Sequence, residues 1–347
     1  MPERLKVGVL GASGYTGADL IRLAACHPAI EITVVTADSQ AGKSLGSVFP
    51  HLSRLEIPDL IKWQDADWSK LDVIFCGLPH GTTQKIVAQL PKDRVVIDLS
   101  ADFRLKDPAI YEEWYGHQHY AEDLQPLAVY GLTEHNRAKI KTARIIACPG
   151  CYPTASLLAL LPLVKNCLID STQIIIDAKS GVSGAGRALR QSTLFCEAGE
   201  GLKPYGIATH RHAPEIEQEI ISVIGNSTVV SFTPHLVPMS RGELVTIHLS
   251  LASGSSVNDL REALDEAYKD EPFVHLLPVG IVPGTQDVRG SNECLIGVYA
   301  DRIDGRAIVI ATIDNLVKGS SGQALQNFNV RFGLDETSGL KQLALFP

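Results

Sequence analysis

The stretch Ala147–Thr154 reads ACPGCYPT, and the rest of the chain is interpreted outward from it. A β-type run, residues 143–147, leads into this stretch, and a helical pattern, residues 155–164, follows it. The Pro-Gly pair predicts a tight turn, and Pro153 predicts the first helical position after it. The sequence therefore places Cys151 between a strand, a turn and a helix.

Cys151 is a candidate nucleophile because of this position. A thiol just before a helix N-terminus faces unpaired N–H groups and the positive end of the helix dipole. Both favour the thiolate, which is the reactive form of cysteine. The alternative is a buried structural cysteine, which is the more common role of a cysteine outside a disulfide.

The composition is that of an ordinary globular protein. The chain has 347 residues, enough for two domains; 45% are hydrophobic and 20% are charged. The net charge of −8 argues against a general nucleic-acid or anionic-membrane surface, although local arginines still allow small anionic substrates. No signal-peptide pattern and no membrane-spanning apolar run is seen, and the seven cysteines are odd in number. We therefore expect reduced thiols and a cytoplasmic location.

A glycine-rich loop, residues 11–17 (GASGYTG), lies between a buried-strand pattern, residues 5–10, and a helical pattern, residues 18–26. Backbone N–H groups in such a loop can hold the pyrophosphate of a dinucleotide. The candidate cofactor contacts are Gly11, Ser13, Gly14, Tyr15, Thr16 and Gly17. The spacing differs from the usual G-x-G-x-x-G, so glycines that serve only a tight turn remain the alternative.

The segment after the second predicted strand, residues 32–36, bears on cofactor choice. An acidic residue at the end of this strand would bind the ribose hydroxyls of NAD. Asp38 comes slightly late for that role, and Ser39 and Lys43 suit the 2′-phosphate of NADP. We favour NADP, with an ordinary solvated loop as the alternative.

Two further buried-strand runs, residues 73–77 and 95–99, indicate an open parallel sheet with helices on its faces. Ligands of such sheets bind at the carboxyl ends of the strands. Arg104 follows the second run and is a candidate for binding a phosphate or carboxylate with two hydrogen bonds. A surface ion pair with a nearby aspartate is the alternative.

The polar and aromatic segment of residues 107–125 predicts a surface excursion. His117 and His119 lie in it, but no third and fourth ligand follow at zinc spacing, so we expect no metal site.

After Cys151 the pattern becomes mixed. Hairpin-like alternation predicts a mostly antiparallel sheet with helices on one face. The expected strands are residues 173–178, 228–232, 244–251, 295–299 and 307–313, and the expected helices are residues 214–223 and 257–268. A last helical pattern, residues 320–330, is expected to return to the first domain. The predicted domains are residues 1–149, with residues 319–347 packed back on them, and residues 150–318.

Two stretches of the second domain carry candidate site residues. The loop of residues 179–187 (KSGVSGAGR) can bind an anion through backbone N–H groups, with a flexible surface loop as the alternative. Pro214 marks a helix start, which places His210 and His212 just before it. A histidine there can act as general acid or base for a thiol. A nucleotide loop, a reactive cysteine, a histidine and arginines are together the parts of a reductase that forms a thioester.

Over essentially its whole length the chain resembles the N-acetyl-γ-glutamyl-phosphate reductase family, which is related to aspartate-semialdehyde dehydrogenase. The matching motifs are residues 11–17 (GASGYTG), 78–81 (LPHG), 98–105 (DLSADFRL), 149–154 (PGCYPT), 180–187 (SGVSGAGR), 209–218 (THRHAPEIEQ), 234–242 (PHLVPMSRG) and 314–319 (DNLVKG). The resemblance implies an α/β Rossmann-type domain and an α+β domain similar to the C-terminal domain of glyceraldehyde-phosphate dehydrogenase.

The resemblance also implies a reaction. N-acetyl-L-glutamyl 5-phosphate would be reduced to N-acetyl-L-glutamate 5-semialdehyde with NADPH and release of phosphate, in arginine biosynthesis. Cys151 would be the nucleophile and His212 the acid/base, with His210 as the second choice and a substrate contact. The remaining implied contacts are Arg104 and Arg187 for substrate anions, and Ser183, Gly184 and Asn315 for the nicotinamide end. A homotetramer or dimer through the second domain's sheet is also implied.

Cys148 departs from the family, which usually has asparagine there. It creates a C-x-x-C pair with Cys151, and a regulatory disulfide between the two is one interpretation of this pair. The closest rival functions are reduction of aspartyl phosphate or of N-acetyl-α-aminoadipyl phosphate. A rival of another class is a non-enzymatic NADPH-binding redox sensor that uses both cysteines.

Overall fold

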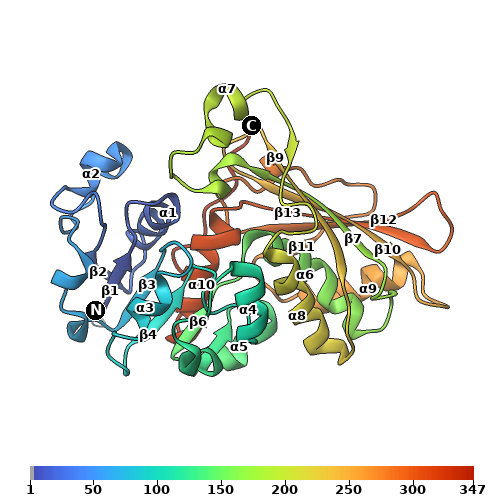
Figure 1. Cartoon of the computed structure of the whole chain (residues 1–347). Coiled ribbons are helices and arrows are strands. Elements are labelled where there is room, and N and C mark those ends of the chain that lie inside the picture. The colour runs from blue at the N-terminus through green and yellow to red at the C-terminus, as the bar shows by residue number, and fades with distance from the viewer. Residues whose placement is uncertain (1–3) are drawn as a thin grey trace. The chain divides into compact units, whose positions relative to one another are not determined.

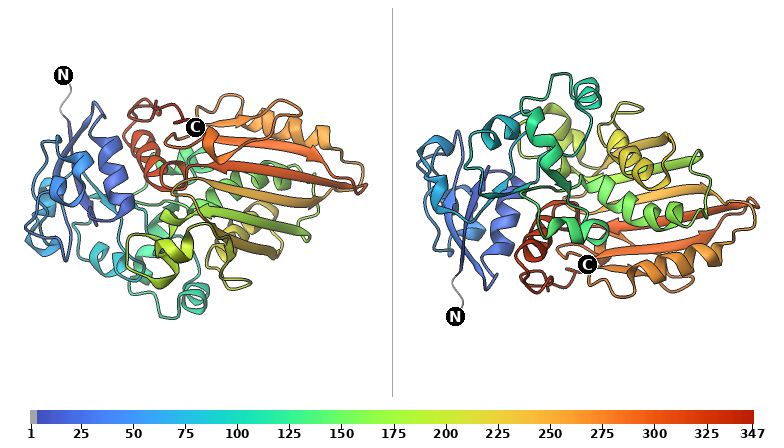
Figure 2. Two further views of the ribbon diagram at one scale, coloured as in Figure 1. Left: turned by 90° about the horizontal axis from the view of Figure 1, so that it is seen from above. Right: turned by 90° about the horizontal axis from the view of Figure 1, so that it is seen from below.

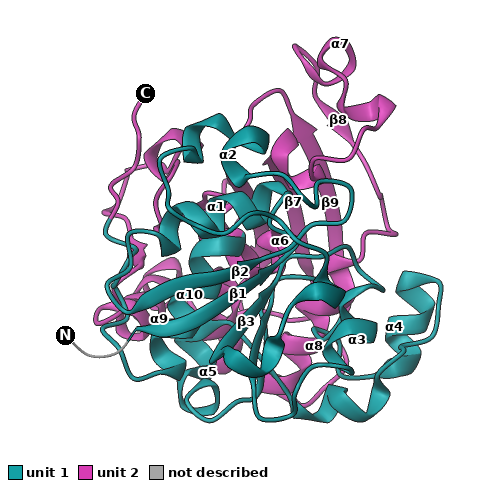
Figure 3. Cartoon of the chain, turned by 90° about the vertical axis from the view of Figure 1, so that its left-hand side faces the viewer, with its two compact units in different colours: residues 1–149, 320–341 teal, residues 150–319, 342–347 magenta. Residues whose placement is uncertain are grey.

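The computed structural model describes residues 4–347; residues 1–3 of the predicted first domain lie outside the described residues. The chain forms two compact units (Figure 3). The first is Met1–Pro149 with Ser320–Lys341, and the second is Gly150–Gly319 with Gln342–Pro347. That the first domain binds the nucleotide and the second carries the catalytic residues stays a prediction.

The first unit contains a parallel sheet with the strand order β2-β1-β3-β4-β6-β5 (Figure 1). Its strands are β1 (Leu5–Leu10), β2 (Ile30–Val35), β3 (Val73–Cys76), β4 (Val95–Asp98), β5 (Ala128–Tyr130) and β6 (Ile145–Ala147). Strands β3, β4 and β6 are buried at every position, as expected of strands covered on both faces. The Rossmann-type parallel sheet predicted from the apolar runs is confirmed.

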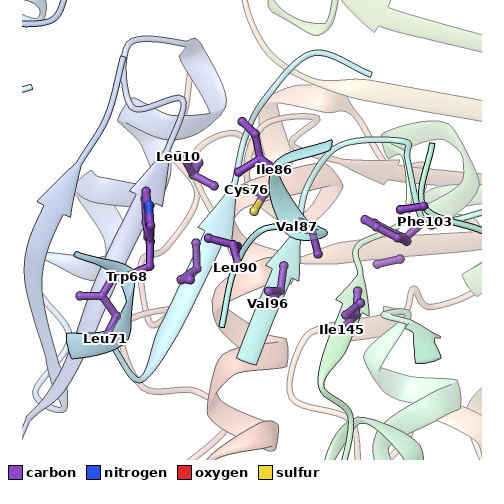
Figure 4. Packing of buried hydrophobic residues seen from close by; sticks show 13 residues of the cluster. Leu10, Trp68, Leu71, Cys76, Ile86, Val87, Leu90, Val96, Phe103 and Ile145 are labelled. Atoms are coloured by element: carbon purple, nitrogen blue, oxygen red, sulfur yellow. The ribbon is translucent and has the colours of Figure 1, made fainter. Parts of the chain in front are cut away.

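Helices cover this sheet. They are α1 (Tyr15–Ala24), α2 (Leu45–Val48), α3 (Thr83–Val87), α4 (Pro108–Tyr115), α5 (Thr133–Ile140) and α10 (Gly322–Arg331). Part of the core between the sheet and its helices is drawn in Figure 4, where Leu10, Ile86, Val96 and Phe103 are labelled. Burial of such side chains is the main favourable contribution to folding.

Helix α10 comes from the end of the chain and packs against α1, α5 and β4. Its polar side chains have partners within the first unit. Ser321 Oγ, at the helix N-cap, donates to Asp19 Oδ2 at 2.8 Å, and Asn329 Oδ1 lies 2.8 Å from His27 Nε2. These contacts join segments about 300 residues apart in sequence (302 in both cases), so the last helix is an integral part of this unit.

The segment of residues 107–125 is mostly exposed or half-buried, as predicted, but it also contains buried side chains. It contains α4, and both Tyr111 and His119 are buried. The Tyr111 hydroxyl donates to Asp102 Oδ1 at 3.1 Å, and His119 Nε2 lies 2.7 Å from the Asp102 carbonyl oxygen. We predicted an exposed segment because its residues are polar. The buried Asp102 instead provides hydrogen-bond partners that keep Tyr111 and His119 in the interior. No cluster of three or more metal-ligating side chains occurs in residues 4–347.

The second unit contains a mixed sheet with the strand order β11-β12-β13-β10-β7-β9-β8. Its strands are β7 (Ile174–Gly181), β8 (Lys203–Pro204), β9 (Val230–Val237), β10 (Glu243–Ser250), β11 (Val274–Leu276), β12 (Cys294–Ala300) and β13 (Arg306–Ile313). In this second sheet, as far as residues 4–347 describe it, only the β7–β9 and β11–β12 pairs are parallel. The mostly antiparallel sheet is confirmed.

The helices of this unit are α6 (Cys151–Lys165), α7 (Phe195–Ala198), α8 (His212–Ile224) and α9 (Val257–Tyr268). Helices α6, α8 and α9 lie over one face of the sheet, which the right-hand view of Figure 2 shows from the helix side. Strand β10 alternates between buried and half-buried positions, as expected when one face meets helices. Among the helices of residues 4–347, none combines the length and hydropathy that a membrane crossing requires.

Candidate active site

Cys151 is the first residue of α6, not a residue before the helix as the sequence suggested. Gly150 is the N-cap, with extended backbone angles (φ −65°, ψ 160°), and Pro153 lies in the first turn. No side chain caps this end of the helix. The half-buried thiol therefore begins the turn whose N–H groups lack intrahelical partners, which favours the thiolate.

The turn before Cys151 is anchored by α8. The Gly150 N–H donates to Glu215 Oε1 at 2.9 Å, and the Glu215 side chain is buried. Thr154 closes the first turn of α6, because both its N–H and its hydroxyl donate to the Gly150 carbonyl at 2.9 Å. The start of α6 and the start of α8 are thereby held together.

Both candidate histidines lie beside this turn. His212 is the first residue of α8, so it lies inside the helix that was predicted to start at Pro214. The His210 and His212 ring centroids are 4.7 Å apart, and each is 5.8 Å from the ring centroid of Tyr152. Burial, aided by the charge of Arg211, lowers the pKa of His210 to about 4, so this imidazole is neutral at neutral pH.

Two tyrosines border the same region and were missed in the sequence. The Tyr205 hydroxyl donates to the Tyr152 hydroxyl at 3.3 Å, and the Tyr152 hydroxyl lies 3.3 Å from the His235 carbonyl oxygen, to which it donates. Burial and the neighbouring acidic groups raise the pKa of both phenols, which therefore remain neutral. The only feature of the sequence that could have identified this pair is the position of Tyr152 directly after the candidate nucleophile.

Glu243 is a further group that sequence reasoning missed. It begins β10, where it pairs with Ser180 of β7 and with Ile313 of β13, and its side chain is fully buried. The pKa of its carboxyl is raised to about 8. Burial is the largest cause, the hydrogen-bonding interaction with Cys151 acts in the opposite direction, and the charge of Asp314 raises the pKa further. A carboxyl group whose pKa is raised to near neutral pH thus interacts with the candidate nucleophile.

The loop after β7 and the segment after β13 meet in the second unit. Asn315 Nδ2 donates to Ser183 Oγ at 2.9 Å, and Asn315 Oδ1 accepts from the Gly242 N–H at 2.8 Å. A Cβ at Gly184 would lie 3.6 Å from Asn315 Nδ2, so the three predicted nicotinamide contacts do lie together. Arg187, on the same loop, is exposed.

Gly319 fixes the space beside Cys151. A Cβ added at Gly319 would lie 2.7 Å from the Cys151 Cβ and 3.2 Å from its Cα. Real Cβ atoms do not approach so closely, and the close packing of interiors offers no room to move. The glycine of the DNLVKG motif is therefore part of the positioning of the thiol.

Gly319→Ala should lower kcat/KM by about 100-fold, because a displacement of the order of 1 Å at a reacting atom costs about that much. The measurement is steady-state kinetics together with thermal unfolding. Gly201→Ala is the matched control, since a Cβ there would meet nothing closer than 3.9 Å. A folded Gly319→Ala enzyme with unchanged kcat/KM would contradict this positioning role.

In the first unit, Arg104 is buried, whereas the ion-pair alternative had placed it at the surface. Its Nε donates to the Cys148 carbonyl at 2.8 Å, and its NH2 group donates to the Leu99 carbonyl at 3.2 Å. These bonds tie the loop after β4 to the end of β6. A direct contact of Arg104 with substrate stays a prediction.

Cys148 is fully buried, and burial raises the pKa of its thiol to about 12. Asn327 Nδ2 lies 3.6 Å from its sulfur as a hydrogen-bond donor. All seven cysteines fall within the described residues, and none is in a disulfide there. A thiol so weakly acidic is a poor partner in thiol–disulfide exchange, which disfavours the redox-sensor interpretation.

The glycine-rich loop of the first unit has the geometry of a nucleotide-binding turn. Gly11 has a φ of 78°, and a Cβ there would lie 2.4 Å from the Gly77 carbonyl oxygen. A Cβ at Gly17 would lie 2.5 Å from the Gly11 carbonyl oxygen. Gly14 is the N-cap of α1 and offers no capping side chain. The bare start of α1 therefore suits a pyrophosphate, and Ser13, Tyr15 and Thr16 lie at its rim.

The residues expected to choose between NAD and NADP lie after β2. Asp38, Ser39 and Lys43 are all exposed. Lys43 Nζ donates to Gln40 Oε1 at 3.0 Å, within the same loop. The loop therefore presents an acidic, a hydroxyl and a cationic side chain, and the choice of cofactor stays a prediction.

Two family models match the chain, one within each unit. Residues 6–143 match the family described as the NAD-binding domain of semialdehyde dehydrogenase, and residues 151–315 match its dimerisation domain. The chain is 54% identical to an N-acetyl-γ-glutamyl-phosphate reductase of Rhodospirillum rubrum, with 100% of both chains covered. It is 54% identical to a probable chloroplastic N-acetyl-γ-glutamyl-phosphate reductase of Arabidopsis thaliana, with 100% of this chain and 86% of that protein covered.

Solved structures show the same fold at low sequence identity. Aspartate semialdehyde dehydrogenase II of Vibrio cholerae has a TM-score of 0.73 at 18% identity and covers 95% of this chain, with 99% of its own chain covered. Aspartate semialdehyde dehydrogenase of Candida albicans, solved with NADP, has a TM-score of 0.68 at 19% identity, with 94% of this chain and 98% of that chain covered.

Proposed function

Because this chain belongs to the N-acetyl-γ-glutamyl-phosphate reductase family, we propose that it reduces N-acetyl-L-glutamyl 5-phosphate to N-acetyl-L-glutamate 5-semialdehyde in arginine biosynthesis. The observation that carries the proposal is the position of Cys151 as the uncapped first residue of α6, beside two histidines. The enzyme is an oxidoreductase, in line with its two semialdehyde dehydrogenase domains.

Cys151 performs the covalent step. Its thiolate attacks the acyl carbon of the substrate, a C–S bond forms, and the C–O bond to phosphate breaks with its electron pair on the departing phosphate. When bound, the nicotinamide cofactor supplies the hydride that reduces the resulting thioester to a thiohemiacetal. Collapse of the thiohemiacetal breaks the C–S bond, releases the aldehyde and returns the thiolate.

The proton on the substrate oxygen is the task we assign to His212. Its ring is held near Cys151 through Tyr152, at the start of a helix, and it can protonate or deprotonate the thiohemiacetal oxygen. His210 is kept neutral by its lowered pKa and serves as a substrate contact. Arg187 and Arg104 are the proposed partners of the substrate's phosphate and carboxylate.

NADPH is the cofactor we propose. The turn of residues 11–17 would hold the pyrophosphate, and Ser39 would contact the 2′-phosphate. Ser183, Gly184 and Asn315 would contact the nicotinamide end. We further propose a homotetramer or dimer through the exposed face of the sheet of the second unit, and a cytoplasmic location.

The reverse reaction tests the function. With N-acetylglutamate semialdehyde and phosphate, the purified protein should reduce NADP⁺, followed at the absorbance band of the product, and turnover should require phosphate. NAD⁺ should give a lower kcat/KM. Aspartate semialdehyde and the aminoadipate homologue run in parallel, because one methylene changes transition-state binding by only about 1–3 kcal/mol.

Each result of this assay decides something. Phosphate-dependent turnover that favours the acetylglutamate substrate supports the proposal. Turnover with only another aldehyde would leave the chemistry in place and overturn the substrate. Absence of turnover from a protein that still binds NADPH would overturn the function itself.

A further inference from the structure

Among residues 4–347, Glu243 is the one fully buried carboxyl to which no N–H or O–H group donates a hydrogen bond at either oxygen. Its neighbours Asp314, Tyr152 and Tyr205 interact with it through charge, whereas the Cys151 thiol is the neighbour whose hydrogen-bonding interaction lowers its pKa. A buried carboxyl without a protein partner is costly unless it is protonated or serves a neighbour. Its position against the candidate nucleophile indicates that the neighbour is Cys151.

The backbone places the two side chains firmly. Glu243 begins β10 and is paired on both sides, with Ser180 of β7 and Ile313 of β13. Cys151 lies against the same end of β13, since a Cβ at Gly319 would meet both the Cys151 Cβ, at 2.7 Å, and the Ile313 Cδ1, at 3.3 Å. Helix α6 packs on β10 and β13. A central strand and the first turn of a helix therefore face each other at this point.

We propose that Glu243 is the proton partner of Cys151: its carboxylate takes the thiol proton, and the resulting carboxylic acid donates a hydrogen bond to the thiolate. The pair exchanges between thiol with carboxylate and thiolate with carboxylic acid, so one proton is conserved and no other base is needed. This inference rests on the proposed role of Cys151 as nucleophile. It goes beyond that role by naming where the sulfur's proton resides.

Two protons take part in the reaction, one on the sulfur and one on the substrate oxygen, and a different residue handles each. While the sulfur is bound in the thioester, Glu243 keeps the proton and stays neutral. When the C–S bond of the thiohemiacetal breaks, the sulfur leaves with the electron pair and again accepts the hydrogen bond of the carboxylic acid. The proton of the substrate oxygen remains the task of His212.

The other charged and titratable groups around the pair do not replace Glu243. Asp314 already accepts hydrogen bonds from the N–H groups of Gly290, Leu316 and Val317, and it pairs with Arg241 at 3.4 Å. Its negative charge raises the pKa of Glu243. The Tyr152 and Tyr205 phenols have raised pKa values, and the pKa of His210 is lowered to about 4. His212 begins α8 and has the substrate oxygen as its proposed proton partner. Lys318 lies over the Phe273 ring, 5.8 Å from its centroid.

The test is the pH dependence of Cys151 alkylation by iodoacetamide in the full chain, without substrate or cofactor. Modification is counted at the Cys151 peptide by mass spectrometry, and the exposed Cys196 serves as the reference thiol in the same sample. Two interacting groups lose their protons in two macroscopic steps. The wild-type rate should therefore rise in two steps more than about one pH unit apart, whereas Glu243→Gln should give one step.

Glu217→Gln is the matched control, since Glu217 is another carboxyl of the second unit with a pKa raised by burial, and it should leave the two steps unchanged. A single step in the wild-type protein overturns the proposal, even if Glu243→Gln fails to fold. The same holds if Glu243→Gln retains two steps. Because no turnover is measured, these outcomes are independent of the substrate, and loss of the proposed function would show separately in the reverse-reaction assay.

Discussion

Cys151→Ser should lower turnover by about 10⁴-fold or more while NADPH binding stays unchanged. The serine hydroxyl has nearly the same size, but at neutral pH it is a far weaker nucleophile than a thiolate at a helix N-terminus. The residue lies at the start of α6 in the second unit, whereas the nucleotide turn of residues 11–17 belongs to the first. Chemistry and cofactor binding should therefore separate in this variant.

Two measurements check this prediction. Incubation with the acyl phosphate in the absence of NADPH should add the N-acetylglutamyl mass to the Cys151 peptide of the wild-type protein and to no peptide of Cys151→Ser. NADPH affinity, followed by its fluorescence, should be the same in both proteins. Cys196→Ser, at an exposed position of α7, should retain full activity and the adduct. A Cys151→Ser enzyme with more than a few per cent of wild-type turnover would rule out the thioester mechanism.

The fold was predictable where local patterns act alone. The apolar run of β1 was predicted as Leu5–Leu10 and is found with the same bounds, because a strand covered on both faces is nearly continuous in apolar residues. Helix α9 was predicted as Val257–Tyr268 and is also found with these bounds. Its start is determined by a capping box, in which Ser256 and Asp259 exchange hydrogen bonds between side chain and backbone.

The errors arose where distant residues decide the outcome. Proline at position 153 suggested a later start of α6, yet the helix begins at Cys151 because Gly150 adopts an extended N-cap conformation that Glu215, 65 residues away, holds in place. His119 was placed on the surface, yet the backbone of Asp102 binds it inside. Partners this far away in the sequence cannot be predicted from a local pattern.

The site shows the same division. Motifs were enough to select Cys151, His210 and His212 as candidates, because each lies at or next to a helix start with a recognisable pattern. Glu243 was missed, because a glutamate at the start of a strand is normally solvated and only the pairing with Ile313 and Ser180 buries it. The contact of Gly319 with the nucleophile was not predictable. Whether a glycine is required at a position depends on which atoms a Cβ would meet, and only the structure shows these.

His212→Asn should lower kcat by about 10²–10⁴-fold, the range expected for loss of a positioned general acid/base. The imidazole begins α8, and its ring centroid lies 5.8 Å from that of Tyr152, the neighbour of the nucleophile. Asparagine retains a hydrogen-bonding group of similar reach but cannot exchange a proton near neutral pH. The KM for NADPH should stay within about twofold, because the variant removes a step of the reaction and not a cofactor contact.

His210→Asn is the matched control for this prediction, since the two rings are 4.7 Å apart and the His212 N–H lies 3.2 Å from His210 Nδ1 as its donor. With its pKa lowered to about 4, His210 does not change charge between about pH 5 and 9, so its loss should raise the KM for substrate without altering the pH profile of kcat. His212→Asn should instead remove one limb of that profile. If the profile of His212→Asn kept the wild-type shape and only its thermal stability fell, His212 would be structural, and if His210→Asn alone lost the limb, the acid/base role would belong to His210.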